Sequence, residues 1–174
     1  MVQLPKKVRH IPTLSLTALA LVLVMGCQSA TRGREVQDAE QVVREFVSIW
    51  NAYDPALVSE IFTRDAVYED QAFDVHVEGP TEIRFFFEQS WKAVPDLKME
   101  VISMFSSGAQ VATQWILSGT HEGDYPGLPA THKSFSIRGV GITEVYDGKV
   151  KRHTDYYDEA EFRRQLGLLP GVGE

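Results

Sequence analysis

The spacing of the apolar residues changes at Pro95-Asp96, a little beyond the middle of this 174-residue chain. Before this point most apolar residues recur every three or four positions, as in amphipathic helices. After it the chain has the pattern of strands. Helices followed by a mostly antiparallel sheet are typical of an α+β fold, in which the helices cover one face of the sheet. We expect a single domain, because the chain is long enough for one core but hardly for two.

The expected helices and strands are bounded by residues that favour their ends. Asp54-Pro55 restarts the chain as a second helix, since Asp caps a helix and Pro suits its first turn. Asp147-Gly148 is a strong signal for a tight hairpin between the last two strands. The expected helices are 38–53, 54–62 and 82–93, the expected strands are 65–70, 99–105, 110–121, 133–146 and 149–157, and a loop through Asp74 and His76 precedes the third helix.

The last strand carries residues suited to acid–base chemistry. Because side chains alternate across a strand, His153, Asp155 and Tyr157 share one face. Asp158 follows as the cap of a short closing helix, three residues before Glu161. Helices packed on one face of a strongly curved sheet leave a cone whose mouth is a natural ligand site. The role of this strand therefore depends on whether its Asp155 face points into that cone.

Residues 1–26 have the pattern of an export signal. Three basic residues precede an apolar, uncharged segment, 14–25, which is too short to span a bilayer comfortably. The signal ends at Gly26-Cys27, which resembles a bacterial lipobox and implies cleavage before Cys27 and acylation of that cysteine. Residues 27–37 would then form the acylated cysteine and a polar tether. The alternatives are an ordinary secretory signal and an uncleaved anchor.

An acylated Cys27 would hold the protein on a membrane of the bacterial cell envelope, facing the periplasm or the exterior. Removal of the three basic residues would change the formal net charge from −7 to −10. Such an acidic domain is poorly suited to bind nucleic acid or an anionic lipid surface. Because Cys27 is the only cysteine, its acylation would also exclude disulfides, thiolate nucleophiles and zinc–sulfur sites.

Several short motifs occur in one order along the chain, and together they resemble the SnoaL-like polyketide cyclase family, often called ester cyclases. The resemblance covers about residues 39–170, so we expect a SnoaL-like domain over 38–170 and a tail over 171–174. It implies the cone-shaped α+β roll of the nuclear transport factor two superfamily, with N-terminal helices packed on a strongly curved, mostly antiparallel sheet and a short C-terminal helix. The motifs are Pro95-Asp96-Leu97, Gly119-Thr120-His121, Gly127-Leu-Pro-Ala-Thr131, Asp147-Gly148-Lys149-Val150, Tyr157-Asp158 and the run from Gln165 to Pro170.

The resemblance also implies a reaction. Characterised members close a polyketide ring by intramolecular aldol condensation without metal or cofactor, and an aspartate of the last strands acts as acid and base. Asp155 matches that aspartate, and a dry aromatic pocket would make its carboxylate a stronger base. His153 and His121 could hydrogen-bond a substrate carbonyl. The alternative for Asp155 is a solvated carboxylate paired with Arg152 or Arg138.

Two other aspartates are candidates for a role at the site. Asp70 ends the segment Ala66-Val-Tyr-Glu-Asp70, which resembles the segment that carries the base of ketosteroid isomerase. The alternative for Asp70 is a loop carboxylate. Asp158 is better explained as a helix cap than as a catalyst.

Aromatic residues are candidates for the wall of a ligand pocket, although each by itself is more typical of an ordinary core. Phe85, Phe86 and Phe87 are consecutive in the third expected helix, so they cannot all face one way. At least one of them should line a cavity or contact a partner. The candidate pocket residues are Trp50, Tyr53, Tyr68, Phe87, Trp91, Trp115 and Tyr157.

No metal or cofactor site is expected, because His76, His121, His132 and His153 lack the spacing of zinc motifs. We therefore expect a cofactor-independent cyclase, isomerase or lyase that acts on a hydrophobic carbonyl compound, with Asp155 as acid and base. The alternatives are a lipid-anchored protein that binds a hydrophobic small molecule without turnover, and a structural lipoprotein of the envelope. The family resemblance also implies a homodimer through the exposed face of the sheet.

Overall fold

The computed structural model describes residues 38–125 and 127–171. The expected signal peptide, Cys27 and the tether lie outside these residues. Within the described ranges, no helix has both the length and the apolar character needed to cross a membrane. The elements are a helix over 38–52, α2 (Pro55–Ile61), β1 (Phe62–Asp70), β2 (Val75–Glu78), α3 (Gly79–Ala93), β3 (Lys98–Ser107), β4 (Gln110–Thr120), β5 (Ser134–Tyr146), β6 (Lys149–Tyr157) and α4 (Glu159–Gln165).

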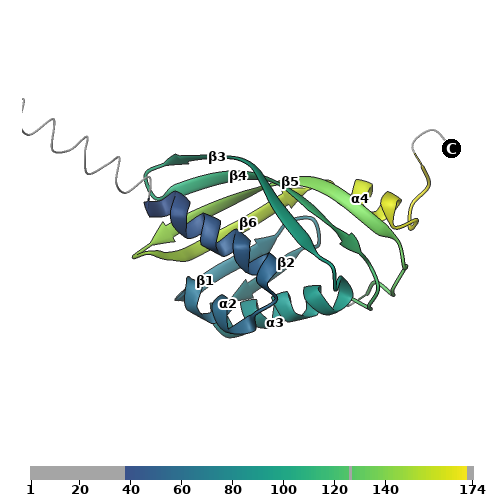
Figure 1. The fold of residues 1–174 in the computed structure, drawn as a ribbon, viewed down its shortest axis with the longest axis horizontal. Coiled ribbons are helices and arrows are strands. Elements are labelled where there is room, and N and C mark those ends of the chain that lie inside the picture. Colours follow the sequence, from purple (N-terminus) through teal and green to yellow (C-terminus); the bar gives the residue numbers. More distant parts are fainter. Residues whose placement is uncertain (1–37, 126, 172–174) are drawn as a thin grey trace, which may run out of the picture. The chain divides into compact units, whose positions relative to one another are not determined.

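The strands form a six-stranded sheet with the order β2-β1-β6-β5-β4-β3. Neighbouring strands run antiparallel, except for β1 and β6, which are parallel. Figure 1 shows the sheet curling around the helix over 38–52, with α3 packed against β1 and β2 and α4 against β5. The expected α+β class, with helices on a curved and mostly antiparallel sheet, is thereby confirmed.

Several elements differ from the expectation. Strand β1 begins at Phe62 rather than at residue 65, so Phe62 lies in a strand and not at the end of the second helix. The expected loop through Asp74 and His76 contains a short edge strand, β2, which pairs with β1. Only two of its four residues, Val75 and Val77, are even half-buried, so the alternation is too short to be recognised in the sequence. Helix α3 begins at Gly79 rather than at residue 82, because Pro80 fits the first turn of a helix.

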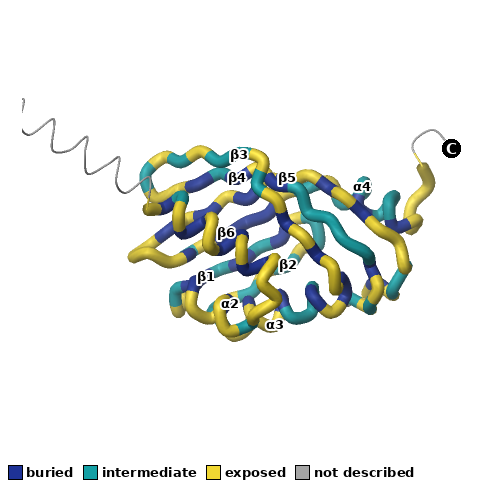
Figure 2. The backbone as a smooth tube through the Cα atoms, viewed as in Figure 1, coloured by how far each residue is buried: buried dark blue, intermediate teal, exposed yellow. Residues whose placement is uncertain are grey.

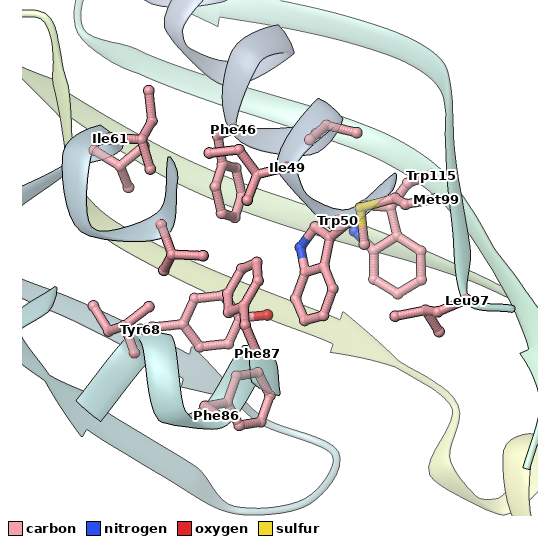
Figure 3. Packing of buried hydrophobic residues seen from close by; sticks show 14 of the residues in the cluster. Phe46, Ile49, Trp50, Ile61, Tyr68, Phe86, Phe87, Leu97, Met99 and Trp115 are labelled. Atoms are coloured by element: carbon pink, nitrogen blue, oxygen red, sulfur yellow. The ribbon is translucent and has the colours of Figure 1, made fainter. Parts of the chain in front are cut away.

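The core lies between the inner face of the sheet and the helices. Strand β5 alternates strictly between exposed and buried residues, so every second side chain faces the core. Figure 2 shows this alternation as bands of yellow and dark blue along the strands. On the helix side, Trp50 stacks on Phe87 with ring centroids 3.8 Å apart, and Phe46 meets Phe62 edge-on at 5.5 Å; Phe46, Trp50 and Phe87 are labelled in Figure 3.

The three consecutive phenylalanines of α3 point in different directions, as the helical period requires. Phe87 is fully buried and Phe86 nearly so, whereas Phe85 is 62 % exposed. Phe86 lines the cavity that is described below. The expectation that at least one of the three lines a cavity is therefore confirmed.

Candidate active site

Two buried aspartates lie side by side in the sheet. Asp70 ends β1 and Asp155 lies in β6, and the parallel pairing of these strands places the two residues in register. Their exposed fractions are only 7 % and 4 %. Arg152 pairs with Glu69 instead, at 3.1 Å. The alternative of a solvated Asp155 paired with Arg152 or Arg138 is therefore wrong, as is that of a loop carboxylate for Asp70.

Three donors hold the carboxylate of Asp155. The Tyr68 hydroxyl donates to Oδ2 at 2.6 Å, the Trp115 indole N–H donates to Oδ1 at 3.0 Å, and His153 Nε2 lies 3.0 Å from Oδ1. Because an ionised carboxylate only accepts, His153 carries a proton on Nε2. Oδ2 keeps an acceptor position that no described residue fills.

The carboxyl group of Asp70 has a different environment. Its Oδ1 accepts from the backbone N–H groups of Ala72 and Phe73 at 2.9 and 3.2 Å, and its Oδ2 accepts from the Tyr157 hydroxyl at 2.8 Å. Burial raises the pKa of Asp70 to about 6; the hydrogen bond from Tyr157 opposes this rise, and the negative charge of Asp155 adds to it. Asp70 therefore keeps its proton up to a pH of about 6, well above the range of an ordinary aspartate.

His153 lies behind Asp155 and is not part of the cavity lining. Its Nδ1 lies 2.8 Å from the Thr143 hydroxyl, and its ring contacts those of Phe46 and Tyr68, with centroid distances of 4.6 and 5.2 Å. With Nε2 donating to Asp155, Nδ1 of a neutral ring accepts from Thr143. His153 is thus placed to orient Asp155 rather than to contact a substrate.

Two glycines of β5 make room for this arrangement. A Cβ on Gly139 would lie 2.2 Å from the Trp115 ring, and a Cβ on Gly141 would lie 2.7 Å from Cε1 of His153. Both distances are far below van der Waals contact, so a side chain at either position would displace its neighbour. The glycines therefore allow two of the donors to reach Asp155.

His121, which directly follows β4, has an unpaired N–H. The backbone N–H of Thr131 donates to its Nδ1 at 3.3 Å, so Nδ1 is the acceptor and the ring proton is on Nε2. Nε2 is buried and has no hydrogen-bond partner among the described residues. Burial lowers the pKa of His121, against the charge of Asp124, so the ring is neutral at neutral pH. An unpaired buried donor costs about 1–3 kcal/mol, which an acceptor on a ligand would recover.

These groups line one cavity of about 90 Å³. Asp70, Asp155 and His121 supply its carboxyl and imidazole groups, and most of the remaining wall is aromatic or aliphatic. No set of three or more His, Cys, Asp or Glu side chains in residues 38–125 and 127–171 is arranged to hold a metal ion. The expected pocket residues that line the cavity are Trp50, Tyr68, Trp115 and Tyr157.

Tyr53, Phe87 and Trp91, also expected in the pocket wall, do not line this cavity. The Tyr53 hydroxyl donates to the Leu97 carbonyl at 2.7 Å, and the Trp91 indole N–H donates to the Trp50 carbonyl at 3.1 Å. Phe87 packs in the core against Trp50. The helical spacing of apolar residues predicts which side of a helix is buried. It does not predict which of the buried residues line a cavity.

Several lining residues have no signal in the sequence. Phe73 lies in the turn between β1 and β2, and Tyr125 lies in the loop between β4 and β5. Residues of turns and loops lack a periodicity that predicts the direction of their side chains. Only the folded chain identifies them.

A known family matches this chain over almost the whole described domain. The sequence model of the SnoaL-like polyketide cyclase family matches residues 40–166. The chain belongs to this family. The expected family is therefore confirmed, while the match of Asp155 to a family aspartate and the catalytic roles of individual residues stay predictions.

Individual relatives agree with this membership. The aklanonic acid methyl ester cyclase of Streptomyces peucetius is 35 % identical over 69 residues, which cover 40 % of this chain and 48 % of that protein. The SnoaL-like chain spans about half the length of the curated relatives it matches. The structure of AclR from Streptomyces galilaeus has a TM-score of 0.67 at 27 % identity, covering 78 % of this chain and 89 % of AclR. A Catenulispora acidiphila protein with a ketosteroid isomerase-like fold, with a TM-score of 0.65 at 16 % identity over 74 % of this chain and 93 % of that protein, supports the fold alone.

Proposed function

We propose that this SnoaL-like protein is a cofactor-independent cyclase, isomerase or lyase that acts on a hydrophobic carbonyl compound through Asp155 and Asp70. The observation that carries the proposal is a pair of buried carboxyl groups with unlike surroundings in one largely apolar cavity, which is also lined by His121, whose Nε2–H has no partner among the described residues. Such a pair supplies a base and an acid in one site. The methyl ester cyclase among the relatives supports ring closure as the reaction class.

The proposed reaction begins with proton abstraction by Asp155. Its Oδ2 takes a proton from the carbon next to the substrate carbonyl, and the electron pair of that C–H bond moves toward the carbonyl oxygen. The N–H of His121 donates to this oxygen as its negative charge develops. In a ring closure, the same carbon bonds to a second carbonyl carbon of the substrate, and Asp70 gives its proton to the oxygen of that carbonyl. The proton on Asp155 restores the one on Asp70, so no oxidant or reductant is consumed.

Tyr68, Trp115 and His153 are positioning residues in this proposal. A buried carboxyl group needs hydrogen-bond partners, and these three side chains supply them for Asp155. The three donors fix the orientation of its carboxyl group in the apolar wall. They leave the second acceptor position of Oδ2 for the substrate proton.

Exchange of α-protons in deuterated water tests the proposal without knowledge of the natural substrate. Cyclohexanone is a small ketone, and the loss of its α-proton NMR signal reports proton abstraction alone. The purified full-length protein should accelerate this exchange, and Asp155→Asn should lower the catalysed rate by about 100-fold or more, since a positioned base contributes about 10²–10⁴. Asp158→Asn, which changes an exposed carboxyl group at a helix cap, should keep the parent rate. An unchanged rate in Asp155→Asn would exclude this residue as the base.

The pH dependence of the same exchange separates the two carboxyl groups. The ketone of the exchange reaction has no second carbonyl group, so we expect protonated Asp70 to donate to the enolate oxygen beside His121, and this protonated form becomes scarce above the pKa of about 6. The catalysed rate should therefore fall by up to about tenfold per pH unit above that value. Asp70→Asn keeps a donor and should remove this fall. A rate that instead rises through pH 6 would make Asp70 the base.

A binding protein without turnover is the second candidate function. The same cavity and the same unpaired donor could hold an apolar carbonyl compound in one orientation. Binding of cyclohexanone to the parent protein, measured by tryptophan fluorescence, without any acceleration of exchange would favour this function. For the structural lipoprotein that is the further alternative, neither binding nor exchange is expected.

We also propose that the protein is an envelope lipoprotein anchored through acylated Cys27. The support is the basic segment, the apolar segment and Gly26-Cys27 in the sequence. Growth with an alkyne-bearing fatty acid should label the parent protein and should fail to label Cys27→Ser, and the parent should fractionate with membranes. Label retained in Cys27→Ser would contradict the assignment.

A further inference from the structure

The inner cavity is smaller than the sites that usually hold apolar compounds. Its volume of about 90 Å³ compares with roughly 300–1,000 Å³ for small-molecule sites in general. It can enclose the carbonyl end of a substrate but not a large hydrophobic body. The rest of a larger substrate would have to lie outside it.

An open groove of about 690 Å³ lies next to this cavity, along β2 and α3. Phe73, Phe86 and Tyr125 line both the groove and the cavity, so these side chains form a wall that the two hollows share. Figure 3 shows Phe86 close to Tyr68, and their ring centroids are 5.0 Å apart. The Tyr68 hydroxyl donates to Asp155. The ring of Tyr68 therefore lies between the groove residue Phe86 and the proposed base.

The groove is lined mainly by apolar side chains, although it lies at the molecular surface. Val75 and Val77 line it from the edge strand β2, and Phe85 lines it from α3 while remaining 62 % exposed. A contiguous apolar surface of this kind marks a binding site for an apolar group. The groove therefore offers what the inner cavity lacks, namely room for a hydrocarbon.

Two of the three residues in the shared wall lie in a turn or a loop rather than in a helix or strand. We expect their side chains to be able to move aside and let a ligand pass from the groove into the cavity. Phe73 and Tyr125 are both half-buried, and their ring centroids lie 6.4 Å apart. Rotation of partly exposed rings is a fast motion that needs no rearrangement of helices or strands. The backbone N–H of Phe73 donates to Asp70, so the proposed acid also holds this part of the wall. Because the groove and the cavity share this wall, the better occupant of the groove is part of the substrate rather than another protein.

We propose that the groove along β2 and α3 is the outer half of the substrate site and receives an apolar arm. The substrate class is then a carbonyl compound with an extended hydrocarbon chain, whose carbonyl end reaches Asp155 and whose chain passes Phe73 and Tyr125 to lie on Phe85. This inference rests on the function proposed for the inner cavity.

Methyl ketones from 2-butanone to 2-decanone test the assignment. Their binding to the full-length protein can be followed through the fluorescence of Trp50 and Trp115, which line the cavity. Once the inner cavity is full, each further methylene that enters the groove should tighten binding by about fourfold. Phe85→Asp places a charge in the groove and should weaken 2-decanone binding by about tenfold or more, while 2-butanone binding stays unchanged. Tyr146→Asp, the introduction of the same charge at a similarly exposed aromatic residue of β5, is the control and should change neither.

The outcomes separate this inference from the proposed function. Failure of 2-butanone to bind overturns the proposed function of the cavity and the inference with it. Binding of 2-butanone without any gain from chain length overturns the groove alone. If binding still tightens with chain length in Phe85→Asp, the hydrocarbon chain lies elsewhere on the protein, and the inference is again overturned. A lower particle mass of Phe85→Asp in light scattering would assign the groove to an interface between copies, which is a further contradiction.

Discussion

Asp70 and Asp155 show how two identical side chains acquire different chemistry from their neighbours. Both are buried in the wall of one hollow, where an isolated charge would be costly. Asp155 has an imidazole and an indole among its donors, whereas Asp70 has two backbone N–H groups and one hydroxyl. Pairs of carboxyl groups with such unlike surroundings can divide the roles of acid and base.

The raised pKa of Asp70 leads to a prediction about stability. Between pH 3.8 and about 6, the native state binds a proton at this group and the unfolded chain does not. The ionised group therefore destabilises the fold at neutral pH by on the order of 3 kcal/mol, and this cost disappears as the pH falls through that window. Asp70→Asn should be more stable than the parent at pH 7.5 and should lose this advantage by pH 4, as measured by urea unfolding at both pH values.

The substitution at Asp70 can preserve the local hydrogen bonds. An amide oxygen at this position can accept from the two backbone N–H groups, and the amide NH₂ can donate to the Tyr157 hydroxyl. Asp147→Asn, at an exposed carboxyl group in the β5–β6 turn, is the control and should show little dependence on pH. An advantage of Asp70→Asn that is equal at both pH values would mean that Asp70 ionises without cost.

Gly141 is the residue at which the support of Asp155 can be tested. A Cβ there would lie 2.7 Å from Cε1 of His153 and 3.2 Å from Oδ1 of Asp155. Gly141→Ala should therefore lower the free energy of unfolding by about 1–3 kcal/mol, as overpacking of a filled core usually does. Val140→Ala, at the exposed neighbouring position, is the control and should cost less. Equal urea midpoints for Gly141→Ala and the parent would show that His153 can move without penalty.

At the scale of the elements, the site depends on the parallel pairing of β1 and β6. Strand β6 follows β5 through the Asp147-Gly148 turn, so its register with β5 is set locally. Strand β1 reaches β6 from a distant part of the chain and brings Asp70 opposite Asp155. A shift of β1 by one residue would turn Asp70 to the other face of the sheet and remove it from the cavity.

Helix α4 depends on its N-cap, and it contributes Phe162 to the cavity wall. Asp158 Oδ1 accepts from the backbone N–H of Glu161 at 2.9 Å, which confirms the expected cap. Asp158→Ala should lower the free energy of unfolding by about 1 kcal/mol, because this N–H loses its acceptor. Asp158→Asn retains an acceptor and should stay close to the parent in thermal unfolding. Equal losses of stability in Asp158→Ala and Asp158→Asn would mean that the negative charge of Asp158, rather than its hydrogen bond to the helix, stabilises α4.

At the scale of the whole molecule, the outer face of the sheet carries an apolar patch. Phe105, Ala112 and Ile142 occupy paired positions on β3, β4 and β5, so they form one row across three strands. Phe105 is 67 % exposed, and Ile142 is exposed as well. Such a patch on a folded domain is typical of a contact surface. We propose that this row joins two copies of the chain.

The proposed dimer predicts the effect of a charge on this row. Phe105→Glu should halve the particle mass of the purified protein in multi-angle light scattering, because a carboxylate in an apolar contact loses its hydration without gaining a partner. Phe85→Glu, at a similarly exposed residue of α3, should leave the mass unchanged. A parent protein that is already monomeric at the same concentration would refute the proposal.

Much of the fold is predictable because its signals act over a few residues. The helical spacing before Pro95, the Asp147-Gly148 turn and the cap at Asp158 each involve neighbours in the sequence, and the structure agrees with all three. Strand β2 was not predicted because its alternation spans only four residues. The cavity wall was predicted in part, since aromatic residues of helices and strands have a period, whereas Phe73 and Tyr125 lie in a turn and a loop.

The residue pattern of the chain is enough to predict the α+β class, the hairpin of the last two strands and the face that His153, Asp155 and Tyr157 share. The folded chain was needed to find that Asp70 lies beside Asp155, that His153 lies behind Asp155, and that Nε2 of His121 has no partner among the described residues. Local backbone preferences fix a helix, a strand or a turn within a dozen residues. The acidity of a carboxyl group and the tautomer of an imidazole depend instead on burial and on hydrogen-bond partners that come from distant segments of the chain.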